Sequence, residues 1–523
     1  MSITTNAINK TNGQIFNGDD IAKIDNNFKT LQDAINNIPS SGGGLTPEQE
    51  AQLDKIGDIT TDLSENTQHI TDLDTNKADK TEVNLRDFAR YGYIDLAKYV
   101  AEGFAHNINF KLYRDTDGKI KHNFNIDSLT SGWLTIYVAG LSGSDTNNGL
   151  TDTTQLSTLQ KAFEIAEARV ETNIIIKITT SILTRTRSAL QISTNNQILT
   201  KNYAIISDTE AYIGSIESQL TWSANGACYQ ASRTGVAYVY DKLNKNWDGS
   251  PIRYKKVSSI AECQNTKGSF YTDGITVYIR RIDDLPIDTD ILVVLLSGVF
   301  RFQLSGDIKF ISKNINYLGC DGANSNFRIM NPSNIGQVIM YNCKFLGSAC
   351  DNAYTFLNIK YSWLFNCIAN GTYRDGFNYH NSTTSKGINS FVFEYGCIAY
   401  DNGLEDANAN NNATTAHDGL NILRIGCIGF NTGGPILADV NGCYSINYDC
   451  TMYDSARPVE GDTKSAYWFD DETPVRHGKS WVINCQGGGI DTYGINSDGI
   501  NEVYIKNFVG RNIPNGQLIT FLD

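Results

Sequence analysis

Three stretches of the chain, YSWLFNCIAN (361–370), FVFEYGCIAY (391–400) and NILRIGCIGF (421–430), share one short pattern. In each, apolar residues stand four and two positions before a cysteine, and Asn or Gly stands directly before it. Similar units, separated by 23, 24, 30, 30, 23 and 35 residues, end at Cys320, Cys343, Cys367, Cys397, Cys427, Cys450 and Cys485. VYIKNF (503–508) resembles a final unit with Phe508 in the cysteine place. The C-terminal part of the chain therefore holds an internal repeat.

Each unit reads as one strand followed by a bend. Apolar residues at every second position indicate a strand with one buried face. The Asn, Gly or Asp before the cysteine marks a bend that suits a positive φ. Units of this length cannot close a core singly, so they must stack. The repeat predicts a parallel β-helix with one rung per unit, in which the alternating apolar residues and the cysteines point inward.

Length and charge restrict the functional class. The 523 residues are too many for one ordinary compact domain. A net charge of −14 without a basic block argues against binding nucleic acid through its phosphates. The N-terminus MSITTNAINKTNG lacks secretory-signal features, and no stretch reaches the roughly 18 apolar residues of a membrane span. We expect folding in a cytosol, no membrane insertion, and free thiols rather than disulfides or a zinc ribbon.

The N-terminal region is predicted to be helical. In DDIAKIDNNFKTLQDAINNI (19–38), six apolar residues recur with spacings of 3, 4, 3, 4 and 3, as in a coiled-coil seam. A single amphipathic helix on a globular core is the alternative. PSSGGG (39–44) would form a flexible joint. NKADKTEV (76–83) resembles trimeric stalk segments of bacteriophage tail fibres, and LRDFARYGYIDLAKYVAEGF (85–104) predicts a short helix or neck.

Three further stretches resemble known β-helical proteins. WLTIYVAGLSGSDTNNGLTDTTQLSTLQKAFEIAEA (133–168) resembles the opening of pectate-lyase-like right-handed β-helix proteins, where a helix from about Ser157 would cap the solenoid. GSFYTDGITVYIRRIDDLP (268–286) resembles a hairpin of carbohydrate-active members. Residues 417–450 are similar to a segment of phage tail-spike and tail-fibre proteins. The resemblance implies an all-β fold, a right-handed parallel β-helix with an N-terminal α-helical coiled-coil stalk, assembled as a homotrimer.

This organisation suggests four regions. We expect a virion-attachment coiled coil with its Gly-rich joint over 1–44, a stalk over 45–86 and a neck over 87–132. A β-helix domain would cover 133–523, with a β-hairpin insertion at about 200–290. The N-terminus would bind other tail or baseplate proteins of the virion.

Counting from the cysteines predicts a column of carboxylates. Asp351, Asp375 and Glu405 each stand eight residues after a repeat cysteine, so they would stack on the outer face of neighbouring rungs. Neighbouring rungs would separate the carboxyls by roughly 5 Å and alternate rungs by roughly 9–10 Å, spacings that suit a retaining and an inverting glycosidase pair respectively. Stacked like charges also raise one pKa, which favours a general acid. Plain surface charge, or a cation held between rungs, is the alternative.

Two Asp-Gly turns add polar side chains to this surface. If the apolar residues of RDGFNYH and HDGLNIL point inward, then Asn378, His380, His417 and Asn421 point outward. We expect the two histidines to act in catalysis and the two asparagines to bind substrate. The alternative is that Asp-Gly is turn scaffold and the histidines are merely solvated.

Further substrate-binding candidates come from two places. The resemblance to tail spikes adds Asp418, Arg424 and Asp439, and strand parity predicts that Arg424 faces outward. AYWFDDE (466–472) combines aromatic and acidic residues, a mixture that suits sugar stacking and acid chemistry. It forms a rival site made of Trp468, Asp470 and Asp471. No cofactor and no resident metal are predicted.

These observations predict a phage tail spike that binds a host cell-surface polysaccharide and depolymerises it, as a hydrolase or a lyase. The protein would be made in the host cytoplasm and located in the virion. One alternative is a non-catalytic receptor-binding or structural tail protein. Another is a hydrolase of phosphodiester-linked wall polymers such as teichoic acids, in which His and Asp clusters would bind a metal.

Overall fold

The computed structural model describes residues 94–522 with gaps, so the coiled coil and stalk predicted over 1–86 lie outside the described residues. The gaps are 117, 185–196, 297–299, 320–326, 334, 349–350, 382–389, 407–409, 457–463, 471–475, 490–491, 498–499 and 511–518. Within this part of the chain, no helix is long and apolar enough to cross a membrane.

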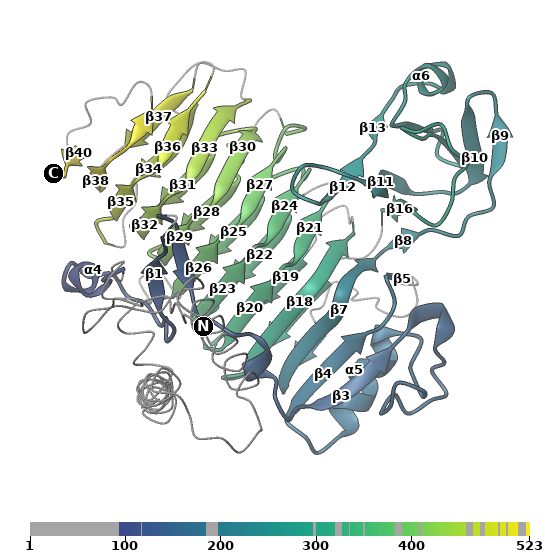
Figure 1. Cartoon of the computed structure of the whole chain (residues 1–523), viewed down its shortest axis with the longest axis horizontal. Helices are drawn as coiled ribbons and strands as arrows, with labels where there is room; N and C mark the ends of the chain where they lie inside the picture. Colours follow the sequence, from purple (N-terminus) through teal and green to yellow (C-terminus); the bar gives the residue numbers. More distant parts are fainter. Residues whose placement is uncertain are drawn as a thin grey trace, which may run out of the picture. The chain divides into compact units, whose positions relative to one another are not determined.

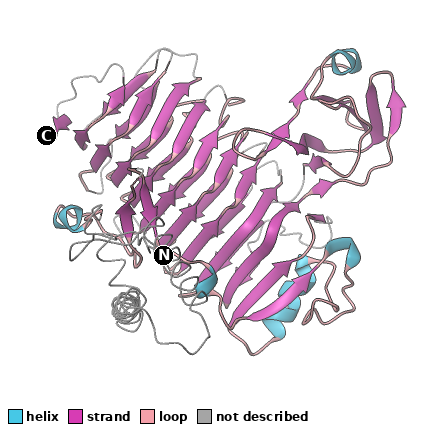
Figure 2. Cartoon of the chain, viewed as in Figure 1, coloured by secondary structure: helices cyan, strands magenta, loops and turns pink. Residues whose placement is uncertain are grey.

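Most of the described chain is a solenoid of parallel strands, and only short helices accompany it (Figures 1 and 2). Successive rungs lie side by side and build three sheets. The first sheet pairs, in order, β3 (Leu134–Val138), β4 (Asn173–Ile178), β7 (Asn202–Gly214), β18 (Lys309–Leu318), β20 (Gln337–Tyr341), β23 (Tyr361–Phe365), β26 (Phe391–Tyr395), β29 (Asn421–Ile425), β32 (Tyr444–Tyr448), β35 (Lys479–Ile483), β38 (Glu502–Lys506) and β40 (Ile519–Phe521).

The other two sheets use the remaining strands of each rung. The second sheet contains β5 (Ile182–Thr184), the C-terminal halves of β7 and β18, β21 (Lys344–Leu346), β24 (Ile368–Asn370), β27 (Ile398–Tyr400), β30 (Ile428–Thr432), β33 (Thr451–Ser455), β36 (Gln486–Gly488) and β39 (Val509–Gly510). The third sheet contains β6 (Gln197–Leu199), β17 (Phe300–Leu304), β19 (Phe327–Met330), β22 (Tyr354–Leu357), β25 (Phe377–His380), β28 (Thr414–His417), β31 (Leu437–Val440), β34 (Ser465–Asp470) and β37 (Tyr493–Ser497). The predicted parallel β-helix is thus confirmed.

The rung register follows the cysteine repeat over most of its length. Tyr361 pairs with Phe391 and Phe391 with Asn421, so each of these rungs takes 30 residues, as the repeat predicted. Val482 pairs with Ile505, which places Phe508 above Cys485. The first unit departs from the prediction, because Asn316 pairs with Lys344 and the residue in register with Cys343 is Ile315, not Cys320.

The predicted bend is confirmed before the six repeat cysteines from Cys343 to Cys485. Asn342, Asn366 and Asn484 have φ values of 51°, 50° and 53°, and Gly396 and Gly426 both have φ 61°. Asn tolerates this left-handed conformation better than other side chains except Gly. The bend turns the chain from the first sheet into the second. Among the described residues, each cysteine is a buried free thiol.

The bend also reverses which residues face inward, and here the prediction was wrong. The cysteines point into the solenoid core, as expected, together with Val392 and Ile422. Phe393 and Leu423, four residues before their cysteines, lie on the opposite face in a separate hydrophobic cluster. Because the left-handed residue adds a turn between strand and cysteine, residues two and four before the cysteine share the outer side rather than the inner one.

These outward apolar residues are covered by residues 94–133, which contain α4 (Ala97–Ala101), the antiparallel pair β1 (Leu112–Arg114) and β2 (Ile120–His122), and a 3₁₀ turn (Asp127–Leu129). The Phe124 ring stacks on Phe365 with centroids 4.5 Å apart. The hydroxyls of Tyr99 and Tyr448 lie 2.5 Å apart. The first sheet is therefore buried on both faces, which explains its near-continuous apolar strands.

Two additions complete the described chain. A 3₁₀ turn (Gly140–Ser142) and helix α5 (Leu159–Ala168), capped by the Thr158 hydroxyl, stand at the N-terminal end of the solenoid, where a helix was expected. An insertion between β7 and β17 carries β8 (Ile216–Glu217), β9 (Ser223–Asn225), β10 (Cys228–Ser232), β11 (Val236–Lys245), β12 (Pro251–Arg253), β13 (Lys255–Lys256), α6 (Ile260–Asn265), β14 (Ser269–Thr272), β15 (Thr276–Arg280) and β16 (Ile291–Leu295). The insertion forms a five-stranded and a four-stranded sheet, and the four-stranded sheet (β12, β11, β16, β8) packs on the second sheet of the solenoid through Tyr238, Leu318 and Leu346.

Candidate functional site

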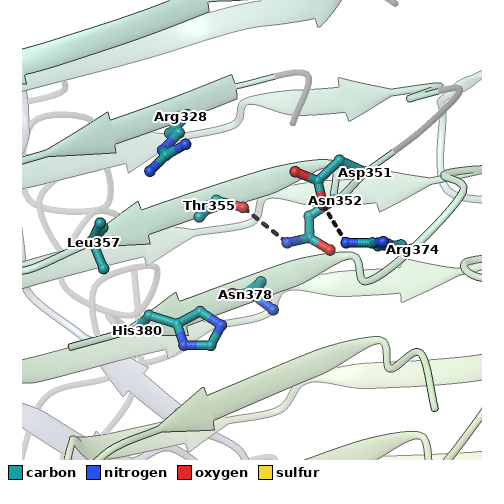
Figure 3. Close-up of a pocket in the computed structure, with 8 residues that line it drawn as sticks. All are labelled: Arg328, Asp351, Asn352, Thr355, Leu357, Arg374, Asn378 and His380. Atoms are coloured by element: carbon teal, nitrogen blue, oxygen red, sulfur yellow. Dashed lines mark hydrogen bonds and ion pairs between the residues drawn. The ribbon is translucent and has the colours of Figure 1, made fainter. Parts of the chain in front are cut away.

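The outer face of the third sheet carries a cavity of about 260 Å³, which we term the sheet cavity. Its lining side chains come from β19, β22 and β25 and from the turns that precede the last two strands (Figure 3). They are Arg328, Asp351, Asn352, Thr355, Leu357, Arg374, Asn378 and His380. Polar side chains dominate this set, whereas the opposite face of the same strands is apolar.

Strand alternation explains this division. Phe377 and Tyr379 of β25 are buried in the solenoid core. Asn378 and His380 consequently point outward, as the sequence predicted. Asn378 lies in register with Thr355, and His380 with Leu357, on the preceding rung. Neighbouring rungs lie about 4.8 Å apart, so their side chains face one shared cavity.

Asp351 is the carboxylate that lines the sheet cavity. Its Oδ1 lies 3.5 Å from Arg374 Nη1, and 24% of its side chain is exposed. Arg374 Nε in turn lies 3.8 Å from Asp406 Oδ2. Because Arg374 is half exposed, solvent screens both pairs and they contribute little stability. The arrangement keeps one solvent-accessible carboxylate at the cavity.

The predicted three-carboxylate column is wrong in register. Asp375 lies level with Asn352 and Asn412, and Asp351 lies level with Arg374. The cause is loop length, since the third-sheet strands β22, β25 and β28 start 11, 10 and 17 residues after the cysteines of their rungs. Glu405 lines a different cavity, where its Oε1 lies 3.9 Å from Arg253 Nη2.

Asp375 is buried behind the sheet cavity. Its Oδ1 accepts a hydrogen bond from the Asn412 backbone N–H at 2.7 Å, and its Oδ2 accepts one from Asn378 Nδ2 at 2.6 Å. Burial raises the pKa of Asp375 to about 6, although these two hydrogen bonds oppose the rise. Asp375 therefore fixes the orientation of Asn378 and is not itself a lining residue.

His380 and His417 form a stacked pair beside the cavity. Their ring centroids are 4.0 Å apart and their planes are 7° from parallel. His380 Nδ1 lies 3.7 Å from Asp418 Oδ2, and His417 Nε2 lies 3.0 Å from the Thr415 hydroxyl. Burial, with a further contribution from the neighbouring His380, holds the pKa of His417 well below its ordinary value. His417 is therefore neutral near pH 7. The His380 side chain is 37% exposed, and it is the histidine of the pair that lines the sheet cavity.

Two polar atoms of the lining residues have no hydrogen-bond partner within the described part of the chain. They are Asn378 Oδ1 and Arg328 Nε. A buried polar atom that makes no hydrogen bond costs free energy unless a ligand or water satisfies it. Both atoms are buried in residues that line the sheet cavity, so a water or ligand entering there is the partner expected to satisfy them.

The outward orientation predicted for Arg424 is wrong, and Arg424 and Asp439 cannot bind a substrate at the surface. Both are fully buried inside the solenoid, where Arg424 Nη1 and Nη2 donate to the Asp439 carboxylate, each at 2.8 Å. Glu394 Oε2 lies 3.5 Å from Arg424 Nε, and the Tyr379 hydroxyl donates to Glu394 Oε1 at 2.6 Å. This interior polar cluster escaped the sequence reasoning because it occupies positions assumed to face solvent.

Asn421 is also buried rather than exposed. Asp418 and Gly419 have φ values of 63° and 81° and form a corner, so His417 and Asn421 belong to different sheets. Asn421 Oδ1 accepts hydrogen bonds from the Ala105 N–H at 3.0 Å and from Arg476 Nη2 at 3.1 Å. Its role is to attach the covering segment, which removes it from the substrate-binding set. Asp418 stays beside His380.

Two residues of the rival site predicted in AYWFDDE (466–472), Trp468 and Asp470, belong to β34 of the third sheet. Trp468 continues the column of Asn378, Thr415 and Ala438, three rungs beyond Asn378. Asp470 continues the column of His380, His417 and Val440. Asp471 lies outside the described residues. Polar and aromatic side chains therefore lie on this face on both sides of one apolar rung, which contributes Ala438 and Val440, with about 4.8 Å between neighbouring rungs.

The chemistry of the sheet cavity is that of proton transfer and hydrogen bonding. A carboxylate (Asp351) and an imidazole (His380) line the same small space, as acid–base catalysis requires. Among the described residues, no group of three or more His, Cys, Asp or Glu side chains is arranged to hold a metal ion.

Comparisons with known proteins add similarities at low identity. No protein-family model matches the chain, and no curated protein sequence matches it significantly. A solved structure named "Glycoside hydrolase" is similar with TM-score 0.44 and 9% identity, over 74% of this chain and 96% of that one. Pectate lyase Pel9A gives TM-score 0.29 and 12% identity over 71% and 80%. The tailspike of Acinetobacter baumannii bacteriophage AP22, in complex with A. baumannii capsular saccharide, gives TM-score 0.22 and 9% identity over 67% and 66%.

Proposed function

We propose that the chain binds a polymeric carbohydrate along the outer face of the third sheet and cleaves it at the sheet cavity. The observation that carries the proposal is that Asp351 and His380 line one cavity, and that two other lining residues, Asn378 and Arg328, hold buried polar atoms without a partner in the described chain. A long polymer fits such a face because parallel rungs about 4.8 Å apart place side chains along it at regular intervals.

In this proposal, each group has one task. Asp351 and His380 are the catalytic residues and transfer the proton that cleavage of a glycosidic bond needs, a contribution of typically about 10²–10⁴-fold. Asn378 Oδ1 and Arg328 Nε bind sugar hydroxyls or oxygens. Asp375 is a positioning residue that holds the Asn378 amide in the orientation that directs its oxygen to the cavity.

The biological setting extends this proposal. A tail spike attached to a virion by an N-terminal coiled coil, assembled as a homotrimer, would present the cavity to a host cell-surface polysaccharide. The heptad seam of residues 19–38 and the resemblance of residues 76–83 to tail-fibre stalks support this assembly. Mass measurement of the full chain tests it, and a monomeric particle would refute it.

A non-catalytic receptor-binding protein is the second candidate. It is favoured by the ion pair between Asp351 and Arg374, which offsets the charge of the only carboxylate among the residues that line the sheet cavity. In that case the same face would bind the polymer without breaking it.

A reducing-end assay separates the two candidates. The full chain is incubated with a panel of purified capsular, O-antigen and wall polysaccharides, and new reducing ends are counted together with loss of viscosity. Asp351→Asn and His380→Ala are expected to lower cleavage at least about hundredfold. Asp152→Asn, a matched change at an exposed turn, should cleave like the wild type. Binding to a polysaccharide without cleavage by the wild type would refute catalysis and favour the receptor-binding candidate.

A further inference from the structure

A second cavity lies where the insertion meets the solenoid, and we term it the junction cavity. Its volume is about 410 Å³. Its lining includes Tyr238, Arg253 and Lys255 of the insertion and Asn370, Tyr400 and Glu405 of the solenoid. Aromatic walls with a few converging polar groups are the usual composition of a small-molecule site.

The walls of the junction cavity are held together by direct hydrogen bonds. Arg253 Nη1 donates to the Gly371 carbonyl at 2.7 Å, and its guanidinium lies 4.9 Å from the centroid of the Tyr238 ring. Gly371 has φ 66°, and a Cβ there would come within 2.9 Å of Arg253 Nη1, so glycine permits this approach. The Ser250 and Tyr400 hydroxyls lie 3.0 Å apart. The cavity is thus preorganised rather than formed by ligand, which reduces the entropic cost of binding.

A large aromatic ring stands exposed at the edge of this junction. Trp247, at the tip of the β11–β12 hairpin, is 64% exposed although its neighbour Ser250 is fixed to the solenoid. Its ring centroid lies 6.3 Å from Tyr400 and 6.1 Å from Phe430. Tyr400, Phe430 and Tyr453 form one register column with nearly parallel rings, at 4.7 and 5.1 Å. The exposed face of Trp247 therefore extends an ordered aromatic surface.

The loop 401–406 runs between the two cavities. Glu405 lies in the junction cavity beside Arg253, and the adjacent Asp406 pairs with Arg374, which lines the sheet cavity. The two cavities are therefore connected by adjacent residues of one loop. A ligand that is longer than one cavity is expected to contact both.

We propose that the junction cavity and the exposed face of Trp247 form a second carbohydrate-binding site, which holds pyranose rings of the same polymer that enters the sheet cavity. The inference rests on the proposed function. The apolar C–H face of a pyranose packs on an aromatic ring, while its hydroxyls hydrogen-bond to groups such as Glu405, Asn370 and Lys255 around the rim. The site retains the polymer and takes no part in bond cleavage.

A second copy of this chain is the competing occupant. A stable protein interface needs about 20–30 residues on each side. The aromatic surface here comprises four side chains, of which Tyr400 is only 5% exposed, and it adjoins a concave cavity with a charged rim. These features favour a small ring-shaped ligand over a protein partner.

Polysaccharide binding by variants of the full chain tests this proposal. A printed array of bacterial capsular, O-antigen and wall polysaccharides identifies the tightest-bound polymer, and its dissociation constant is then measured by biolayer interferometry. Trp247→Ala should weaken binding roughly tenfold, the effect typical when an aromatic anchor is truncated. Ile275→Ala changes an equally exposed apolar residue of the insertion that lies outside the aromatic surface of Trp247, Tyr400 and Phe430; it is the matched control and should bind like the wild type.

The outcomes distinguish this proposal from the proposed function. Trp247→Ala that binds like the wild type, while Arg328→Ala binds weakly, would refute the second site and leave the sheet cavity intact. Wild type that binds no polysaccharide would refute both. Trp247→Ala that changes the oligomer mass would assign this surface to a contact between copies and refute carbohydrate binding there. Binding that depends on Trp247 without any cleavage by the wild type would support the second site alone.

Discussion

Replacement of Asp375 by Asn tests the role of the buried carboxylate in most detail. The substituted amide would turn one N–H group toward the Asn378 amide or the Asn412 N–H, both of which are donors to Asp375 in the wild type. The Asn378 amide can rotate, because its Oδ1 has no partner in the described chain, and can then accept from the new amide. The variant should fold, with a loss of about 1.5–3 kcal/mol, the contribution of a hydrogen bond to a charged group. It would, however, present an N–H donor to the sheet cavity in place of an acceptor.

The pH dependence of stability gives this prediction a magnitude and a sign. The folded-state pKa of Asp375 is raised from an ordinary 3.8 to about 6. The folded state therefore binds more protons than the unfolded state between these values. The contribution of Asp375 to the free energy of unfolding is fully present below pH 3.8 and is lost as pH rises through 6, a change of up to about 3 kcal/mol. Asp375→Asn should remove this pH dependence, so its stability deficit against the wild type should shrink between pH 4 and pH 7.

Two assays measure the effect. Urea unfolding at pH 4, 5.5 and 7 gives the free energy of unfolding of wild type and Asp375→Asn. Polymer cleavage then gives kcat and KM, and the loss should appear mainly in KM, since the altered amide binds substrate rather than transferring a proton. A deficit that is constant across this pH range would refute the raised pKa. A loss confined to kcat would refute the positioning role and restore Asp375 as a catalytic residue.

Other predictions concern the interior and the bends. Asp439→Asn should cost about 3–5 kcal/mol in urea unfolding, since Arg424 would lose its bidentate partner inside the core; a cost below 1 kcal/mol would contradict the buried pair. Burial raises the pKa of Glu394 from 4.5 to about 8, so its contribution to stability is lost as pH rises across that window, and Glu394→Gln should flatten the profile there. Asn366→Val should cost roughly 1–3 kcal/mol of strain at φ 50°, whereas Asn366→Gly should be nearly neutral; equal melting temperatures for the two would contradict the strained bend.

The sequence alone was sufficient to predict the solenoid. The cysteine repeat fixes the rung lengths from Cys343 onward, and the Asn or Gly before each cysteine identifies the left-handed bend. Both are local requirements of the backbone, so they leave a visible pattern. Asn378 and His380 were placed on the outer face correctly because β25 alternates cleanly between core and surface.

The inner and outer faces of the first sheet could not be separated from the sequence. Both are buried, one in the core and the other beneath residues 94–133, so apolar residues occur on both faces of its strands. The core side even holds Ser362, Glu394 and Arg424, which a parity argument assigns to solvent. In this sheet, a polar residue therefore indicates polar partners inside the protein and does not indicate exposure to water.

The candidate site depended on loop lengths that a fixed count cannot reproduce. Asp351 and Asp375 differ by one position in their rungs, and Glu405 belongs to another cavity. The arginines Arg328 and Arg374 were missed because neither stands in a repeated position. The sequence signal for Arg374 was its place directly before the Asp-Gly turn that starts β25.

The most direct test of polymer cleavage at the sheet cavity is a crystal structure of the full chain carrying Asp351→Asn, with crystals soaked in an oligosaccharide of the polymer that the chain binds. We expect a sugar ring in the sheet cavity, within hydrogen-bond distance of Asn378 Oδ1 and Arg328 Nε, with its glycosidic oxygen between position 351 and His380. An oligosaccharide bound elsewhere, with the sheet cavity holding only water, would contradict it.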